Sequence, residues 1–350
     1  MTFEIADFDI NAASEADLAA LLEVVNDIDR ELHPRHIDLT AEDFRMFSNN
    51  PGTEEMRLVV REGAELVATA TFRHPDDGTN PDLLQCSVRV LPEHRRRGIG
   101  TMLLRRAVEV ADAKDRSELQ GFVFDTAPAG HEFALAIGAE QQLEFHENVV
   151  RVDALDREML QSWVDQGPKR APGYSIRQVE VWPEEMLSDI AYLFHVLERD
   201  MPMSPSFEPR EWNADRVREL QEHYADGVDA ISVFAIHDQS GRPVGMTDMI
   251  RRKTDPSTWM VTVTMVDPDH RGRSLGKWIK GAANLAALER WEGGVYEETG
   301  NAFINQPMLA INHAMGFEHE LTMTDMLLPV GRARSYLERL ARPGASPEPR

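Results

Sequence analysis

The spacing of apolar residues divides the chain into short strands that alternate with amphipathic helices. Apolar positions recur at helical spacing over residues 18–32 and again over residues 103–111. Residues 56–61 and 65–72 are rich in β-branched and aromatic side chains and flank a Glu-Gly-Ala turn, which predicts neighbouring strands. We therefore expect an α+β fold built on a mixed α/β sheet.

The same order of elements occurs twice along the chain. Each half reads strand, helices, three strands, helix, strand, helix, strand, and the second copy begins near Tyr174. Between the copies, residues 165–173 (DQGPKRAPG) hold two prolines and two glycines that interrupt the periodicity. This repetition predicts two tandem domains, residues 1–164 and 174–341. The proline-rich residues 342–350 predict a disordered tail.

Composition and charge narrow the classes of partner. The chain has 350 residues and a formal net charge of −23, which disfavours nucleic acid and anionic membrane surfaces and favours a cationic acceptor. No apolar run is long enough for a membrane span, and the amino-terminal residues lack a signal-peptide pattern. The single cysteine, Cys86, excludes an internal disulfide. We expect a cytoplasmic protein without a metal, with Cys86 either packed in a core or acting as an acyl carrier.

One turn motif appears at the matching place in both halves. Residues 88–100 read VRVLPEHRRRGIG and residues 264–276 read TMVDPDHRGRSLG. A strand that turns directly into a helix presents unpaired backbone N–H groups, and the helix dipole adds positive potential there. Glycines let a phosphate approach the backbone closely. A single copy is equally consistent with a basic turn that begins an amphipathic helix, but two matching copies favour an anion site.

Both turns resemble the R-x-x-G-x-G loop with which GNAT N-acyltransferases hold the pyrophosphate of acetyl-CoA. Residues 298–301 and 305–317 resemble the fifth strand and fourth helix of that family. The resemblance implies two GNAT domains in tandem, acetyl-CoA as the cofactor, and direct attack by a small-molecule primary amine in a ternary complex. It assigns to acetyl-CoA the residues Val88, Arg89, Val90, Arg95, Arg96, Arg97, Gly98, Ile99, Gly100, Thr101, Val266, Arg271, Gly272, Arg273, Ser274, Leu275, Gly276 and Asn305. For Asn305, the role of a helix N-cap is favoured over a contact with the ligand.

The acid–base chemistry is harder to locate in the sequence. Acyl transfer to an amine needs a base, and an acid can protonate the departing thiolate. The resemblance places a tyrosine acid at positions that are here Ala134 and Asn312, and a glutamate near positions that are here Gln85 and Val261. The base candidates that remain on or beside strands are Glu298, Asp125 and Asp248, with Glu298 considered first. For each of them, a structural or solvated role is favoured over a catalytic one.

The two halves differ, and other functions stay open. Ser274 stands where the first turn has Gly98, which predicts tighter acetyl-CoA binding by the first half. The segment 198–207 is expected to lie over the acceptor. The layout also resembles that of mycothiol synthases, which acetylate a cysteinyl-sugar amine. The missing tyrosine and glutamate leave a catalytically silent acyl-CoA sensor as an alternative.

Overall fold

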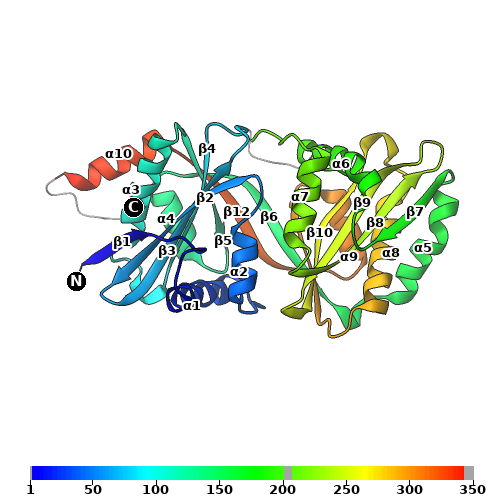
Figure 1. Cartoon of the computed structure of the whole chain (residues 1–350), viewed down its shortest axis with the longest axis horizontal. Helices are drawn as coiled ribbons and strands as arrows, with labels where there is room; N and C mark the ends of the chain where they lie inside the picture. Colours follow the sequence, from blue (N-terminus) through cyan, green and yellow to red (C-terminus); the bar gives the residue numbers. More distant parts are fainter. Residues whose placement is uncertain (1, 201–206, 343–350) are drawn as a thin grey trace. The chain divides into compact units, whose positions relative to one another are not determined.

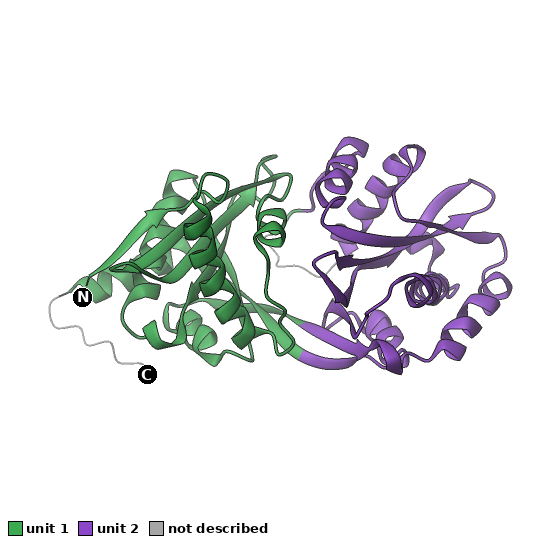
Figure 2. Ribbon diagram, turned by 60° about the horizontal axis from the view of Figure 1, so that its bottom comes forward, with its two compact units in different colours: residues 1–145, 203–208, 321–350 green, residues 146–202, 209–320 purple. Residues whose placement is uncertain are grey.

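The chain folds into two compact units, each built around its own part of a mixed sheet (Figure 1). The structure is a computed structural model that describes residues 2–200 and 207–342. Unit 1 consists of residues 1–145, 203–208 and 321–350, and unit 2 of residues 146–202 and 209–320 (Figure 2).

The sheet of unit 1 follows the order β1-β2-β3-β4-β5-β12. Its strands are β1 (Phe3–Asp7), β2 (Thr53–Glu62), β3 (Glu65–Pro75), β4 (Leu83–Val90), β5 (Glu118–Phe124) and β12 (Glu318–Pro329). Strands β1 to β4 are antiparallel neighbours, whereas β4 and β5 run parallel. In Figure 1 the late strand β12, drawn in orange, lies beside the early strand β5.

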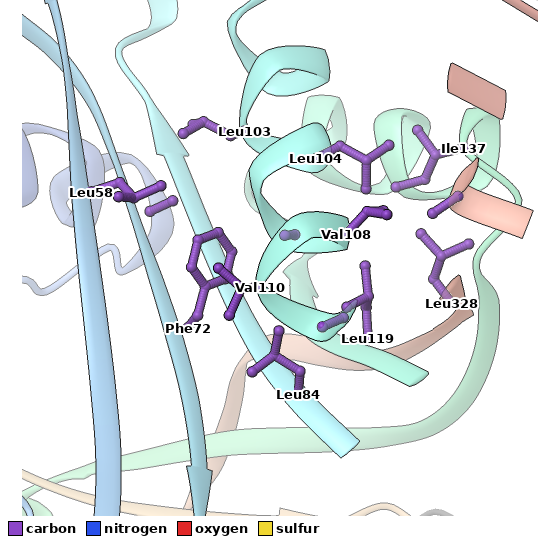
Figure 3. Packing of buried hydrophobic residues seen from close by; sticks show 14 of the residues in the cluster. Leu58, Phe72, Leu84, Leu103, Leu104, Val108, Val110, Leu119, Ile137 and Leu328 are labelled. Carbon is purple, nitrogen blue, oxygen red and sulfur yellow. The ribbon is translucent and has the colours of Figure 1, made fainter. Parts of the chain in front are cut away.

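Helices cover both faces of this sheet. They are α1 (Glu15–Leu32), α2 (Ala41–Ser48), α3 (Ile99–Ala113), α4 (Pro128–Ala136) and α10 (Val330–Ala341), with the short 3₁₀ helix η1 (Pro92–His94) before α3. Leu103, Leu104 and Val108 of α3 pack on Leu58 and Phe72 of the sheet in the main apolar core (Figure 3). On the other face, α1 and α2 bury a second apolar cluster.

Unit 2 repeats this arrangement with the strand order β6-β11-β10-β9-β8-β7. Its strands are β6 (Glu140–Arg151), β7 (Tyr174–Val179), β8 (Val228–His237), β9 (Arg242–Arg252), β10 (Asp255–Val266) and β11 (Tyr296–Ala302). Its helices are α5 (Arg157–Arg170), α6 (Leu187–Asp200), α7 (Ala214–Tyr224), α8 (Leu275–Arg290) and α9 (Gln306–Ala314), and its 3₁₀ turns are η2 (Val152–Ala154), η3 (Glu184–Met186) and η4 (Pro268–His270).

The units are not two consecutive stretches of sequence. Strand β6, which ends the first half of the chain, lies in the sheet order of unit 2, and β12, which ends the second half, lies in the sheet order of unit 1. From Leu321 onward, β12 belongs to unit 1, where it pairs antiparallel with β5 from Met323↔Phe124 to Pro329↔Glu118. The second part of β6 belongs to unit 2, where Val150 packs with Met315 in one apolar cluster. The observed division therefore differs from the predicted one at residues 1–164 and 174–341. The alternation of apolar and polar residues predicts both strands, but it does not indicate which sheet each strand joins.

The predicted linker at residues 165–173 is wrong for most of its length. Helix α5 continues through Gly167 and Pro168 to Arg170. A Cβ atom added at Gly167 would overlap the buried indole ring of Trp278 in α8, so this glycine lets the two helices lie in direct contact. Glycine and proline side by side are typical of an interrupted element, whereas here they lie within a helix and the glycine permits close helix packing. Of the predicted tail, residues 343–350 lie outside the described residues.

Candidate functional site

In each unit a parallel pair of strands separates after a short stretch of pairing. Strands β4 and β5 pair from Leu83↔Glu118 to Gln85↔Gln120, and β10 and β11 pair from Thr258↔Tyr296 to Val261↔Thr299. Beyond these points, residues 86–90 and 262–266 continue as strand without a parallel neighbour in the described residues. Backbone N–H and C=O groups on that side can therefore bond a peptide-like ligand.

Each separating strand leads through a 3₁₀ turn into a helix, and the two turns have the same backbone geometry. The Nε atom of Arg95 donates to the carbonyl oxygen of Val90 at 3.0 Å, and that of Arg271 donates to the carbonyl oxygen of Val266 at 2.8 Å. Both bonds tie the arginine to the residue five positions earlier, at the end of the strand. This arginine of the motif therefore shapes the turn in both units.

Two positions in each turn adopt left-handed backbone conformations. In unit 1 they are Arg96 and Gly98, with φ of 60° and 88°; in unit 2 they are Gly272 and Ser274, with φ of 79° and 61°. A residue other than glycine costs roughly 1–2 kcal/mol in this conformation. Each turn thus holds one glycine and one strained residue, and Ser274 keeps the left-handed conformation that Gly98 has.

Helices α3 and α8 begin without a side-chain cap. Their first helical hydrogen bonds run from Met102 N to Gly98 O at 3.0 Å and from Trp278 N to Ser274 O at 3.1 Å. The preceding N–H groups of the first turn have no acceptor within the helix, and the helix dipole makes this end positive. Each helix therefore offers several backbone donors to an anion such as a phosphate.

The arginines of the first turn do not all remain available to an anion. Arg95 forms a two-pronged ion pair with Glu31, and Arg97 forms one with Glu62. Within the described residues, Arg96 makes no ion pair, and its side chain is exposed. Of the three arginines predicted to bind a phosphate, two are therefore paired with carboxylates, and Arg96 is the one whose charge is left unpaired within the described residues.

The second turn divides its arginines in a similar way. Arg271 donates to the Oδ2 atom of Asp200 at 2.6 Å, an acid at the end of α6. Arg273 donates to the carbonyl oxygens of Asp269 at 3.3 Å and Arg271 at 3.1 Å. In the part of the chain that the structure describes, Arg273 has no carboxylate partner, so the charge of its guanidinium is not neutralised there.

The glycines and the asparagine that complete the motif have packing roles. A Cβ atom at Gly100 would lie 3.2 Å from the ring of Phe133 in α4, and one at Gly276 would lie 3.5 Å from Ile311 in α9. These glycines bring the two helices of each unit together behind the turn. The side chain of Asn305 accepts from Met308 N at 3.4 Å and caps α9, which is the structural role considered above.

The three carboxylates considered as bases lie in different surroundings. Asp125 is exposed, and its Oδ1 atom accepts from the backbone N–H of Thr322 at 3.0 Å, which holds the start of β12 against unit 1. Glu298 is half-buried on β11, in register with Met260 of β10. Asp248 is 7% exposed on β9 and lies beside β10. Asp125 therefore belongs to unit 1, whereas Glu298 and Asp248 lie on different strands of unit 2.

Asp248 is the most perturbed of these groups. Burial raises the pKa of its carboxyl to about 6, although hydrogen bonds from Ser232 and Thr262 oppose the rise. The Oγ1 atom of Thr262 donates to Asp248 Oδ2 at 2.8 Å, and Ser232 donates to Oδ1. A carboxyl with a pKa near neutrality can exchange protons at physiological pH.

A buried polar cluster in unit 2 was not expected from the sequence. Asn312, at the position considered for a tyrosine acid, is fully buried; its Oδ1 accepts from Lys280 Nζ and its Nδ2 donates to Asn301 Oδ1 at 2.6 Å. Burial lowers the pKa of Lys280 and raises the pKa of the nearby Glu297. A lysine within the apolar stripe of α8 was the available signal. Its partners come from β11 and α9, which sequence spacing does not connect.

Two further observations concern metal binding and membrane insertion. In residues 2–200 and 207–342, no group of three or more histidine, cysteine or acidic side chains is arranged to hold a metal ion. Among the described helices, none combines the length and apolarity that a membrane crossing requires.

Comparisons with known proteins agree with this geometry. Residues 20–136 match the sequence model described as the "Acetyltransferase (GNAT) family". The search of curated proteins gives no match. A solved tandem GNAT protein from the clavulanic acid biosynthesis pathway is 24% identical, with a TM-score of 0.78, over 94% of this chain and 99% of its own. A GCN5-related N-acetyltransferase from Sphaerobacter thermophilus is 14% identical, with a TM-score of 0.65, over 94% and 96%. These likenesses confirm the predicted α+β fold in its tandem form.

Proposed function

We propose that this chain is a tandem GNAT acetyltransferase and that it transfers the acetyl group of acetyl-CoA to a primary amine of a small molecule. The observation that carries the proposal is the pairing, in both units, of separated parallel strands with an uncapped helix start. An elongated ligand with amides at one end and a pyrophosphate at the other matches these two features.

The residues of the first unit suit such a ligand in a defined way. The free strand side at residues 88–90 offers backbone groups to the amides of the pantetheine arm. The N–H groups at the start of α3 and the side chain of Arg96 suit the pyrophosphate. When bound, acetyl-CoA supplies the acetyl group as a thioester. In unit 2 the corresponding groups lie at residues 264–266 and 274–277 and on Arg273.

Direct attack by the amine fits the state of the single cysteine. Cys86 is half-buried on β4, and its thiol donates to the carbonyl oxygen of Leu84 at 3.5 Å. Burial raises the pKa of this thiol, so it stays protonated and is a poor nucleophile. An acyl-cysteine step is therefore disfavoured, and both substrates are expected to be bound together when the acetyl group moves.

The acceptor is expected to be a cation in its resting form. The net charge of −23 favours approach of a positively charged small molecule. Of the segment 198–207 that was considered as its cover, residues 201–206 lie outside the described residues. Glu198, at the near end, accepts from Arg210 N at 2.6 Å and from Trp212 Nε1 at 2.8 Å. This acid therefore braces the described part of the connection.

The proposal is tested by following thiol release from acetyl-CoA in the presence of single amines. The panel contains spermidine, kanamycin, glucosamine, a cysteinyl-sugar amine and a peptide with a free amino terminus, and mass spectrometry identifies any acetylated product. Thiol release that depends on an amine is the expected result. Calorimetric binding of acetyl-CoA without turnover of any amine would contradict the proposal and favour a silent acyl-CoA sensor.

A further inference from the structure

We infer that unit 2 performs the acyl transfer and that Thr262 passes the amine proton to Asp248. This inference rests on the proposed function and adds to it the identity of the active unit and of the proton path. It depends on three observations: the position of Thr262 in β10, the hydrogen bonds around Asp248, and the absence of an equivalent pair in the described residues of unit 1.

Thr262 lies where strands β10 and β11 separate. The last pair between them is Val261↔Thr299, so Thr262 is the first residue of β10 beyond the pairing. The register with β9 also shifts here: Val261 faces Met249 and Val263 faces Asp248, which leaves Thr262 as an extra, bulged residue. A β-bulge redirects a side chain and frees backbone groups from the ladder. The side chain of Thr262 is exposed, so a substrate can reach it.

The hydrogen bonds around Asp248 fix the direction in which protons are shared. Trp182 Nε1 donates to Ser232 Oγ at 2.8 Å, so the Ser232 hydroxyl directs its own hydrogen to Asp248 Oδ1. Thr262 Oγ1 directs its hydrogen to Asp248 Oδ2 at 2.8 Å, with a longer contact of 3.2 Å to the Asp248 carbonyl oxygen. The Thr262 oxygen therefore retains lone pairs that can accept a proton from an exposed substrate.

The groups that shift the pKa of Asp248 are themselves uncharged. Its face of the sheet carries Phe234 and Met246, which pack on apolar side chains of α6 and on Val217 of α7. Strands β8 and β10 contribute the hydroxyls of Ser232 and Thr262. The raised pKa of Asp248 has burial as its largest cause, and no charged group in the described residues contributes to it. Glu298 is a second carboxylate on this face, one strand beyond β10.

The proton path balances the chemistry of the transfer. The ammonium form of the acceptor first loses one proton to solvent, which leaves a neutral amine with a free electron pair. As this nitrogen forms its bond to the thioester carbonyl carbon, the carbon–sulfur bond breaks and sulfur leaves with the electron pair as a thiolate. The amine proton passes to Thr262 Oγ1 while the hydroxyl proton passes to Asp248 Oδ2. Asp248 later releases this proton to solvent, and solvent protonates the thiolate. Thr262 is then the group that touches the substrate, and Asp248 is a positioning residue and proton acceptor behind it.

The described residues of unit 1 lack both parts of this arrangement. The two units can be compared by counting from the residue that pairs with the end of the separating strand. In unit 2 this residue is Gly245, which pairs with Val266, and Asp248 follows it by three positions. In unit 1 the residue three beyond Ala68, which faces Val90 at the end of β4, is Thr71. The β3–β4 ladder runs through Thr71↔Ser87 and Phe72↔Cys86 without a bulge. The corresponding position therefore has no carboxylate and no residue pushed out of the ladder.

The test uses the full chain and the best acceptor from the amine panel. Thr262→Val removes the hydroxyl, Thr262→Ser keeps it, and Asp248→Asn removes the proton acceptor. We expect Thr262→Val and Asp248→Asn to lower kcat about 10²-fold or more, with the KM for acetyl-CoA nearly unchanged, and Thr262→Ser to keep most of the activity. The acidic limb of the wild-type pH–rate profile should disappear in Asp248→Asn.

A matched control separates this path from a general effect of buried acids. Asp325 of unit 1 is also a buried carboxyl with a raised pKa, and Gln120 donates to it at 3.0 Å. Asp325→Asn should leave kcat and the pH profile unchanged. Equal losses in Thr262→Val and Thr262→Ser, or wild-type kcat in Asp248→Asn, would overturn the inference. If the wild-type chain acetylates no amine, the proposed function itself fails, and that outcome is visible before any variant is made.

Discussion

The close contact between helices α5 and α8 predicts that replacing Gly167 by alanine lowers the stability of the protein. The same replacement at a glycine outside this contact should not. Gly167 in α5 lies over the middle of the Trp278 ring, where a Cβ atom would overlap Cδ2 and Cε2. Trp278 is only 4% exposed, so the ring cannot swing away, and α5 must move off α8 to admit the methyl group. Gly167→Ala should therefore destabilise unit 2, whereas alanine usually improves an exposed helix.

The magnitude follows from two opposing terms. Overpacking a core position costs about 1–3 kcal/mol, and an overlap with a rigid ring belongs near the upper end. Replacing glycine by alanine in a helix returns about 1 kcal/mol. The net loss is then about 2 kcal/mol in the free energy of unfolding, which lowers the melting temperature of a domain of this size by about 4–8 °C.

Calorimetry of Gly167→Ala and Gly331→Ala measures this difference. Gly331 lies in α10, and an added Cβ atom there meets nothing within 4 Å, so the same chemical change should be neutral or stabilising. In a Trp278→Leu background the cost of Gly167→Ala should shrink, because the residues in contact are coupled. A Gly167→Ala protein as stable as the wild type would refute the close packing of α5 on α8 and restore residues 165–173 as a linker.

Three further predictions concern the turns and the buried acid. Gly98→Trp should weaken acetyl-CoA binding more than Ser274→Trp in calorimetric titration, and a loss confined to Ser274→Trp would reverse the ranking of the units. Arg96→Ala should raise the Kd for acetyl-CoA about tenfold or more, since charge-assisted hydrogen bonds contribute about 1.5–3 kcal/mol; an unchanged Kd would remove Arg96 from the site. The folded-state pKa of Asp248, about 6, lies above the ordinary 3.8. Its contribution to stability is therefore complete below about 3.8 and is lost as the pH rises through about 6. Denaturant titrations across this range should show that loss in the wild type, and an equal slope in Asp248→Asn would exclude Asp248 as its source.

The sequence predicts the local parts of this protein well because their signals are local. The helix expected after the first turn and the strand before it occur at Ile99–Ala113 and Leu83–Val90. What the sequence could not predict depends on distant partners. Arg95, Arg96 and Arg97 are three consecutive arginines in the sequence, but Glu31 and Glu62, at separations of 64 and 35 residues, engage the first and the third. The bulge at Thr262 likewise follows from pairing with β9, and no residue type marks it.

The geometry of the two turns also explains why the sequence alone does not indicate which half is catalytic. Each turn needs two left-handed residues, and each half supplies one glycine at a different one of the two positions. In backbone strain, Ser274 of the second turn is therefore matched by Arg96 of the first. The difference that remains is the side chain that Ser274 adds at the position where the first turn has Gly98, and the tryptophan variants test that difference. The turns are alike in geometry, whereas the surroundings of the strand that precedes them are not: unit 2 has a buried acid and a bulge where unit 1 has Thr71 in a regular ladder. A difference in catalytic activity between the units is therefore expected to come from the residues beside the separating strands. In backbone geometry, the phosphate-binding motif, on which the resemblance rests, does not distinguish the two units.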